Sequence, residues 1–130
     1  MKREINYAII NLGKAISKLH KGVLSAKDEL DKDGVIQRFE FTFELFWKTL
    51  RVFLRDSGIE TKTPKESLKE AFRVGWLDDE DIFLDMLEDR NKTSHIYDKE
   101  TSEVIFERIK DSYIICIQQV LDKLKKQAGA

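Results

Sequence analysis

The residues best suited to chemistry lie in one polar stretch, residues 90–98, which reads RNKTSHIYD. Arg90 offers a permanent planar cation that can hold a phosphate by two parallel hydrogen bonds. His95 offers the side chain that gives or takes a proton near neutral pH. Together they suffice for metal-free cleavage of RNA: His95 would activate the 2′-hydroxyl or protonate the leaving oxygen, and Arg90 would stabilise charge on the phosphorus oxygens. Asn91 is close enough along the chain to orient either group.

Whether Arg90 and His95 can meet depends on where the helix before them ends. They are five positions apart, so on an unbroken helix they would point about 140° away from each other. The intervening sequence NKTS contains three side chains that bond locally to backbone and are poor in helix interiors. We therefore expect the helix to stop between Arg90 and His95. If the chain then runs extended, His95 and Tyr97 project to the same side.

A purely structural interpretation of this stretch also has to be considered. Arg90 would then pair with a carboxylate near the helix end, such as Glu88 or Asp89, and His95 would be an ordinary loop histidine. Judged by spacing alone, this interpretation is the favoured one.

The elements that must position the stretch are helices, because apolar residues recur at helical spacing and the chain has one proline and six glycines. From Ile5 to Leu30 the apolar positions alternate by four and three, which predicts one long first helix with a narrow apolar seam. Residues 31–34, DKDG, then predict a turn in which Asp33 caps the second helix.

The second helix carries more apolar surface than a simple bundle needs. One broad aromatic arc faces the core, but Phe41, Leu45 and Val52 form a second stripe roughly opposite to it. Either this helix is central and contacts its own domain on two sides, or the stripe is a self-association surface. Gly58 is a suitable residue to end the helix.

Start signals mark the remaining helices. Residues 63–66, TPKE, form a capping box with proline at the first helical position and predict a short third helix. Residues 78–81, DDED, predict the start of a fourth helix that runs toward Arg90, and Thr101 is expected to cap the last helix. The predicted fold is all-α: a single domain over residues 1–130, built as an up-and-down bundle of four main helices plus one short helix.

Composition narrows the possible functions. The 23 Lys and Arg nearly balance 24 Asp and Glu, so the net charge of −1 gives no overall field that favours a polyanion, which counts mildly against tight, nonspecific RNA binding. One cysteine and two histidines are too few for a convincing metal cluster, and no metal or cofactor is expected. The longest apolar run, YIICI, is too short to cross a membrane, and the N-terminus has no signal-peptide core. We therefore expect a cytoplasmic protein without a membrane partner.

Residues 90–97 resemble the R-x4-H-x-Y motif of the HepT-like branch of the HEPN superfamily, small all-helical prokaryotic proteins often called nucleotidyltransferase substrate-binding proteins. The segments FEFTFELFWKTL and TPKESLKEAFRVGWL are also similar to theirs, and the resemblance covers nearly the whole chain. It implies an HEPN-like bundle, a homodimer with the motif at its cleft, and a small nucleotidyltransferase partner made from a neighbouring gene.

The resemblance also assigns roles to the motif. It implies that Arg90 and His95 are a ribonuclease pair, that Asn91 assists them, and that the partner attaches adenylate to Tyr97. The pairing would be that of a toxin with its enzymatic antitoxin, because adenylate beside His95 adds charge and bulk that exclude RNA. Alternatively, Tyr97 seals the loop onto the bundle.

Three functions remain open from the sequence. The leading one is a dimeric endoribonuclease restrained by its nucleotidyltransferase. The second is a non-catalytic subunit that presents a substrate or nucleotide to that enzyme, with Arg90 and His95 as phosphate ligands. The third is a helical adaptor without a ligand.

Overall fold

The computed structural model describes residues 2–93 and 98–129, and within these residues the chain is helical with short connections and no strand. The elements are α1 (Lys2–Ser25), α2 (Glu29–Asp56), α3 (Pro64–Arg73), α4 (Glu80–Thr93), α5 (Lys99–Arg108), the π-helical segment η1 (Ile109–Tyr113) and α6 (Ile114–Gly129). The last three follow one another without a break, so they form one long, bent helical run. The predicted all-α bundle of four main helices and one short helix is therefore confirmed.

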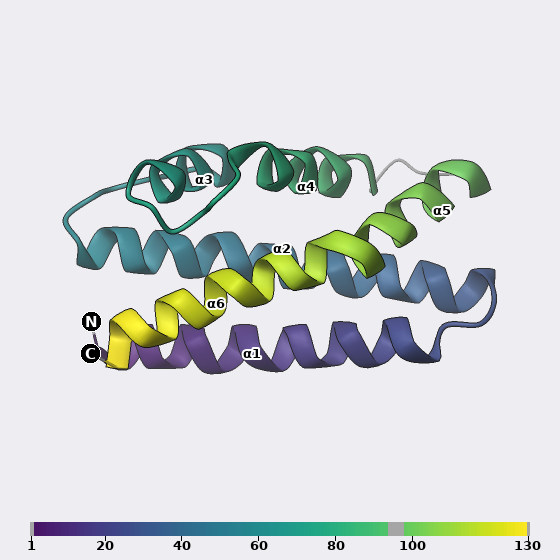
Figure 1. Ribbon diagram of the computed structural model, residues 1–130, viewed down its shortest axis with the longest axis horizontal. Coiled ribbons are helices and arrows are strands. Elements are labelled where there is room, and N and C mark those ends of the chain that lie inside the picture. The colour runs from purple at the N-terminus through teal and green to yellow at the C-terminus, as the bar shows by residue number, and fades with distance from the viewer. Residues whose placement is uncertain (1, 94–97, 130) are drawn as a thin grey trace.

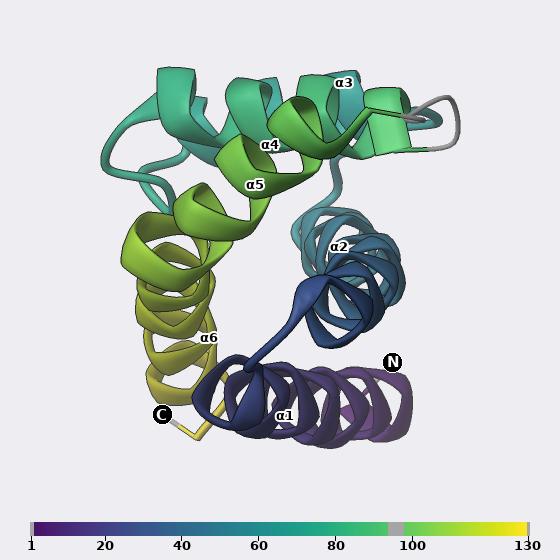
Figure 2. The same cartoon turned by 90° about the vertical axis from the view of Figure 1, so that its right-hand side faces the viewer.

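α2 is the central helix. It runs antiparallel to α1, carries α3 and α4 on its other side, and is crossed by the α5–α6 run (Figures 1 and 2). Phe39 and Phe46 of α2 are fully buried: Phe39 stacks on Tyr113 with ring centroids 5.4 Å apart, and Phe46 stacks on Phe83 at 5.5 Å. The aromatic side chains of α2 therefore contact both α4 and the last helical run. These contacts position the two elements between which the polar stretch, residues 90–98, lies.

The first helix boundary lies earlier than predicted. Residues 31–34 are inside α2 and do not form a turn, and the N-cap is Asp28, not Asp33. Asp28 Oδ1 accepts from the Asp31 N–H at 2.8 Å, while Asp31 Oδ2 accepts from the Lys27 N–H at 3.0 Å. This reciprocal pair satisfies free N–H groups on both sides of the helix start. Leu30, which continued the predicted seam, is 78 % exposed.

The other end signals are mostly confirmed. Thr63 caps α3 by accepting from the Glu66 N–H at 3.1 Å, and Gly58 adopts φ +87° directly after the C-cap of α2. Thr101, however, is not the cap of the last helix. Asp98 caps α5, and its carboxylate accepts from both the N–H and the hydroxyl of Thr101 at 2.6 and 3.0 Å. No described helix has the length and apolar content needed to span a bilayer.

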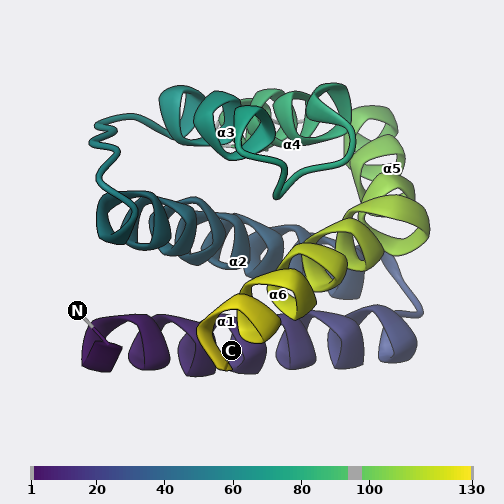
Figure 3. The same ribbon diagram turned by 60° about the vertical axis from the view of Figure 1, so that its left-hand side comes forward.

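The third view shows how the long helical run turns: α5 descends beside α4, and α6 then crosses toward α1 (Figure 3). The change of direction falls at η1, which separates the two α-helical parts. Residues on either side of η1 can therefore contact different neighbours, with α5 meeting α2 and α6 meeting α1.

Candidate functional site

The predicted site lies at the C-terminal end of α4. This helix carries Glu80 and Asp81 in its first turn and Arg90 and Lys92 in its last, the charge order that suits a helix dipole. A local hydrogen bond also stabilises its last turn: the Thr93 hydroxyl donates to the Arg90 carbonyl at 2.6 Å. Arg90 therefore belongs to a regular helix turn and not to a loop.

The Arg90 guanidinium is held across the bundle by α2. Its Nη2 forms an ion pair with Glu44 Oε1, and its Nη1 donates to Asn91 Oδ1 at 3.4 Å. The other oxygen of Glu44 lies 3.6 Å from Lys48 Nζ, so two cations share one carboxylate. The Arg90 side chain remains 33 % exposed, so its partners do not enclose it completely.

The structural interpretation named the wrong partners for Arg90. Glu88 pairs with Lys92 at 3.4 Å, and Asp89 pairs with Arg108. Neither is the partner of Arg90, whose carboxylate comes from a residue 46 positions earlier in the chain. Side chains on a helix meet at spacings of three and four, so adjacent residues such as Asp89 and Arg90 face different neighbours.

His95 and Tyr97 lie outside the described residues. Arg90 and Asn91 are described and contact each other, whereas the convergence of Arg90, His95 and Tyr97 stays a prediction. α4 is helical to Thr93, so the predicted end of the helix before His95 falls at the edge of the described residues.

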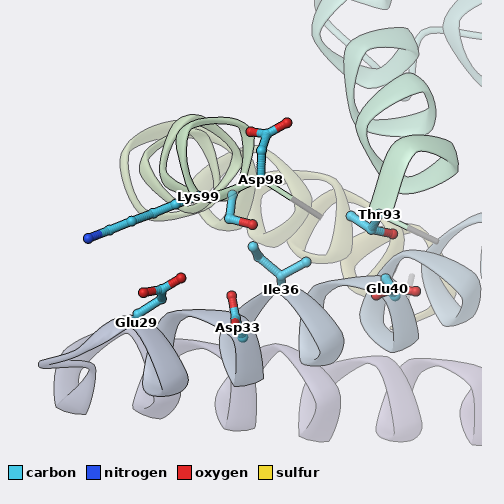
Figure 4. Close-up of a pocket in the computed structure, with 8 residues that line it drawn as sticks. Glu29, Asp33, Ile36, Glu40, Thr93, Asp98 and Lys99 are labelled. Atoms are coloured by element: carbon cyan, nitrogen blue, oxygen red, sulfur yellow. The ribbon is translucent and has the colours of Figure 1, made fainter. Parts of the chain in front are cut away.

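An acidic hollow of about 240 Å³ lies beside this end of α4. α2 contributes half of the described residues that line it, and Figure 4 shows Thr93 from α4 on one side and the start of α5 on the other. Among the described residues that line it, the carboxylates are Glu29, Asp33, Glu40 and Asp98, and the one cation is Lys99. Hydrogen bonds from the backbone and side chain of Thr101 lower the pKa of Asp98, so this carboxylate is charged at neutral pH. The described lining therefore carries more negative than positive charge, which disfavours phosphate.

Sequence reasoning did not find this hollow. Glu29, Asp33, Ile36 and Glu40 follow one another by four, three and four residues, which is the signal of a single helix face. The signal was lost because the expected turn at residues 31–34 divided that face.

The residue before Arg90, Asp89, belongs to a polar cluster with Arg108 and Tyr113. Asp89 is 2 % exposed, and Arg108 Nη1 donates to its two oxygens at 2.9 and 3.0 Å. The Tyr113 hydroxyl also donates to Asp89 Oδ2. Burial, and next the hydrogen bond with Asp89, raise the pKa of Tyr113, while the same carboxylate raises the pKa of Arg108. The sequence does not predict this cluster, because Arg108 and Tyr113 lie 19 and 24 positions after Asp89 and meet it only through the packing of the helices.

Comparison with known families decides what kind of protein this fold and site belong to. Residues 5–126 match the model of the family described as "Nucleotidyltransferase substrate binding protein like". The chain belongs to this family. The resemblance seen in the sequence is thereby confirmed.

Individual relatives agree with the family. The chain is 32 % identical over 99 residues to a Haemophilus influenzae protein named "Probable ribonuclease HepT", in a match that covers 72 % of this chain and 67 % of the relative. A crystal structure from Thermus thermophilus has a TM-score of 0.82 and 38 % identity, covering 87 % of this chain and 98 % of its own. A Haemophilus influenzae structure described as the substrate binding domain of a nucleotidyltransferase has a TM-score of 0.68 and 25 % identity, covering 96 % and 99 %.

The three residues expected at a dimer interface differ in exposure in this family member. Phe41 is 63 % exposed, whereas Leu45 and Val52 are half-buried and packed against the core. Phe41 lies three residues from Glu44, so it is on the same side of α2 as the carboxylate that holds Arg90. Within the described part of the chain, no group of three or more metal-ligating side chains comes together.

Proposed function

We propose that this protein is a HepT-like toxin, a metal-independent endoribonuclease that cuts RNA with Arg90 and His95. A small nucleotidyltransferase from a neighbouring gene would keep it inactive by attaching adenylate to Tyr97. The observation that supports this most is the position of Arg90, which is partly exposed in the last turn of α4, held by Glu44 and Asn91, directly before the segment that contains His95. The relative named as a probable ribonuclease supports the same reaction.

The reaction needs only these side chains and the RNA itself. The 2′-oxygen attacks phosphorus and loses its proton to a base, while the bond to the 5′-oxygen breaks and that oxygen takes up a proton. His95 is the residue proposed for proton transfer, and Arg90 neutralises charge on the phosphorus oxygens. When a phosphate takes over Arg90, Lys48 remains beside Glu44, so that carboxylate keeps a cationic partner.

The homodimer belongs to the same proposal. Phe41, Leu45 and Val52 on α2 would meet their copies across a two-fold axis, and two Arg90–His95 pairs would then line one groove. Doubling the cations in one groove compensates for a net charge of −1, which alone attracts RNA weakly.

A second function is favoured by different observations. The family is described by substrate binding, Arg90 is already neutralised by Glu44, and the hollow next to it is acidic. These features fit a non-catalytic subunit that presents a substrate to a nucleotidyltransferase. A cationic substrate would suit the acidic hollow better than RNA would.

Cleavage of RNA by the purified protein in EDTA tests the first function. We expect the wild type to cut RNA, and Arg90→Ala and His95→Ala each to lower kcat about a hundredfold or more, because positioned acids, bases and charge-stabilising groups contribute on this scale. His20→Ala and Arg73→Ala are matched controls, because both residues are exposed and lie on α1 and α3. Cleavage that survives both motif substitutions excludes the enzyme as placed here.

Mass spectrometry after incubation with the nucleotidyltransferase and ATP tests the control step. We expect a mass increase of one adenylate on the Tyr97 peptide and none on the peptides of Tyr7 or Tyr113. Absence of RNA cleavage, together with a substrate-dependent complex with the nucleotidyltransferase, would favour the second function.

A further inference from the structure

The long C-terminal helical run contains a π-helical segment, η1. The residue before η1 and the last residue of η1 both donate a hydrogen bond to the buried carboxylate of Asp89. These two residues are Arg108 and Tyr113, and Asp89 belongs to α4. The Ile114 N–H donates to the Ile109 carbonyl, which is the five-residue hydrogen bond that defines a π turn.

The π winding is what allows both contacts. Arg108 and Tyr113 are five residues apart, so on an α-helix their side chains would point about 140° away from each other. A π turn closes after five residues and therefore brings these positions close to one face. Such segments are rare, since their geometry is less favourable than that of an α-helix. Here the two contacts to Asp89 offset that cost.

Asp89 needs both partners. Its carboxylate is almost completely buried, and a buried charge without hydrogen-bonded partners is strongly unfavourable. Arg108 supplies the opposite charge with a bond to each oxygen, and Tyr113 supplies a further donor from inside the core, where its ring stacks on Phe39. The end of α4 is thereby tied to the C-terminal run by side chains.

The contacts of Asp89 with Arg108 and Tyr113 also affect the orientation of Arg90. Consecutive residues on an α-helix project about 100° apart, so Asp89 faces η1 while Arg90 faces Glu44 on α2. Any rotation of the last turn of α4 that moved Arg90 away from Glu44 would also pull Asp89 away from Arg108 and Tyr113. The two contacts together fix the direction of the guanidinium.

We propose that the Asp89–Arg108–Tyr113 cluster is a positioning device for RNA cleavage, which aims Arg90 by fixing the rotation of the last turn of α4. None of the three residues touches the reacting phosphate in this proposal. It rests on the proposed ribonuclease function, because it assigns its effect to Arg90 in that reaction.

Tyr113→Phe is the sharpest test, because it removes one hydroxyl and keeps the ring that stacks on Phe39. We expect kcat for RNA cleavage to fall about tenfold with KM within about twofold, since small misplacements of a catalytic group lower the rate by up to about a hundredfold. Tyr7→Phe is the matched control, because it removes an exposed hydroxyl from α1, and its kcat should equal that of the wild type. Arg108→Gln should behave like Tyr113→Phe, and Arg108→Lys should recover part of the rate.

A second measurement separates this inference from the proposed function. The Nε–H signal of Arg90 in a nitrogen-15 NMR spectrum, assigned with Arg90→Lys, should shift in Tyr113→Phe and stay in place in Tyr7→Phe. If the wild type cuts no RNA, the ribonuclease proposal fails, and the NMR signal alone decides whether the cluster positions Arg90. If the Arg90 signal does not move in Tyr113→Phe, the inference is overturned. It is also overturned if kcat of Tyr113→Phe equals that of the wild type, or falls by no more than the folded fraction of the variant falls.

Discussion

Two neighbouring side chains of α4 make their ion pairs in different directions, and both pairs join residues far apart in the sequence. Arg90 reaches Glu44 on α2, and Asp89 reaches Arg108 on α5. The types of these residues could be read from the sequence, but their partners could not, because 24 acidic residues compete for 23 basic ones and only the packing of the helices ranks them. The predicted partners, Glu88 and Asp89, were the carboxylates nearest in sequence.

The buried phenol of Tyr113 makes stability depend on pH. Burial, followed by the hydrogen bond with Asp89, raises the pKa of Tyr113 above its usual value near 10, so the folded protein retains a proton that the unfolded chain loses from about pH 10 upward. The folded state then binds more protons, and its free energy of unfolding falls as pH rises. Below pH 10 this contribution is fully present.

Tyr113→Phe should remove this pH dependence. We expect the stability advantage of the wild type over Tyr113→Phe to shrink by about 1 kcal/mol between pH 9 and pH 11. Urea unfolding at the two pH values measures it, and lysine deprotonation cancels in the difference. Tyr7→Phe serves as the control and should unfold in parallel with the wild type. A constant difference between the wild type and Tyr113→Phe would show that the phenol is not protected from ionisation.

At the scale of elements, the sequence predicted the number and order of helices but misplaced two of their starts. The apolar period of α1 continued across the real connection because Ala26 and Leu30 happen to keep its spacing, although Leu30 is 78 % exposed. The π segment could not be predicted from its own sequence. It depends on Asp89, which belongs to another helix.

The position of the α2 cap gives a paired prediction. Asp28→Ala removes the acceptor of the Asp31 N–H and should lower the free energy of unfolding by about 1 kcal/mol. Asp33→Ala changes the residue that the sequence suggested as the cap, now an exposed position inside the helix, and should change stability by less than about 0.5 kcal/mol. Chemical denaturation of both variants measures the difference. Equal losses, or a larger loss for Asp33→Ala, would contradict the observed helix start.

At the scale of the whole molecule, the core could be predicted better than the surfaces. The aromatic arc of α2 was expected to face inward, and Phe39, Phe43 and Phe46 are fully buried. The residues of the second apolar stripe of α2 differ in burial: Leu45 and Val52 pack against the protein's own core, while Phe41 is 63 % exposed. A sequence pattern shows that a residue is apolar but not whether a neighbouring helix already covers it. Phe41 therefore carries most of the proposed dimer contact.

The proposed dimer predicts that one exposed residue controls both assembly and activity. Phe41→Ser should shift the protein from dimer to monomer at micromolar concentration in sedimentation velocity, because a buried aromatic anchor typically supplies a large share of binding energy at an interface. Leu30→Ser, at another exposed apolar position of α2, is the matched control and should remain dimeric. Both residues are mostly exposed in the single chain, so neither variant should change the thermal unfolding of a monomer by much. If the groove needs both copies, RNA cleavage by Phe41→Ser should fall in proportion to the fraction of monomer. A fully active monomer would contradict this and would show that one Arg90–His95 pair within a single chain is enough for cleavage.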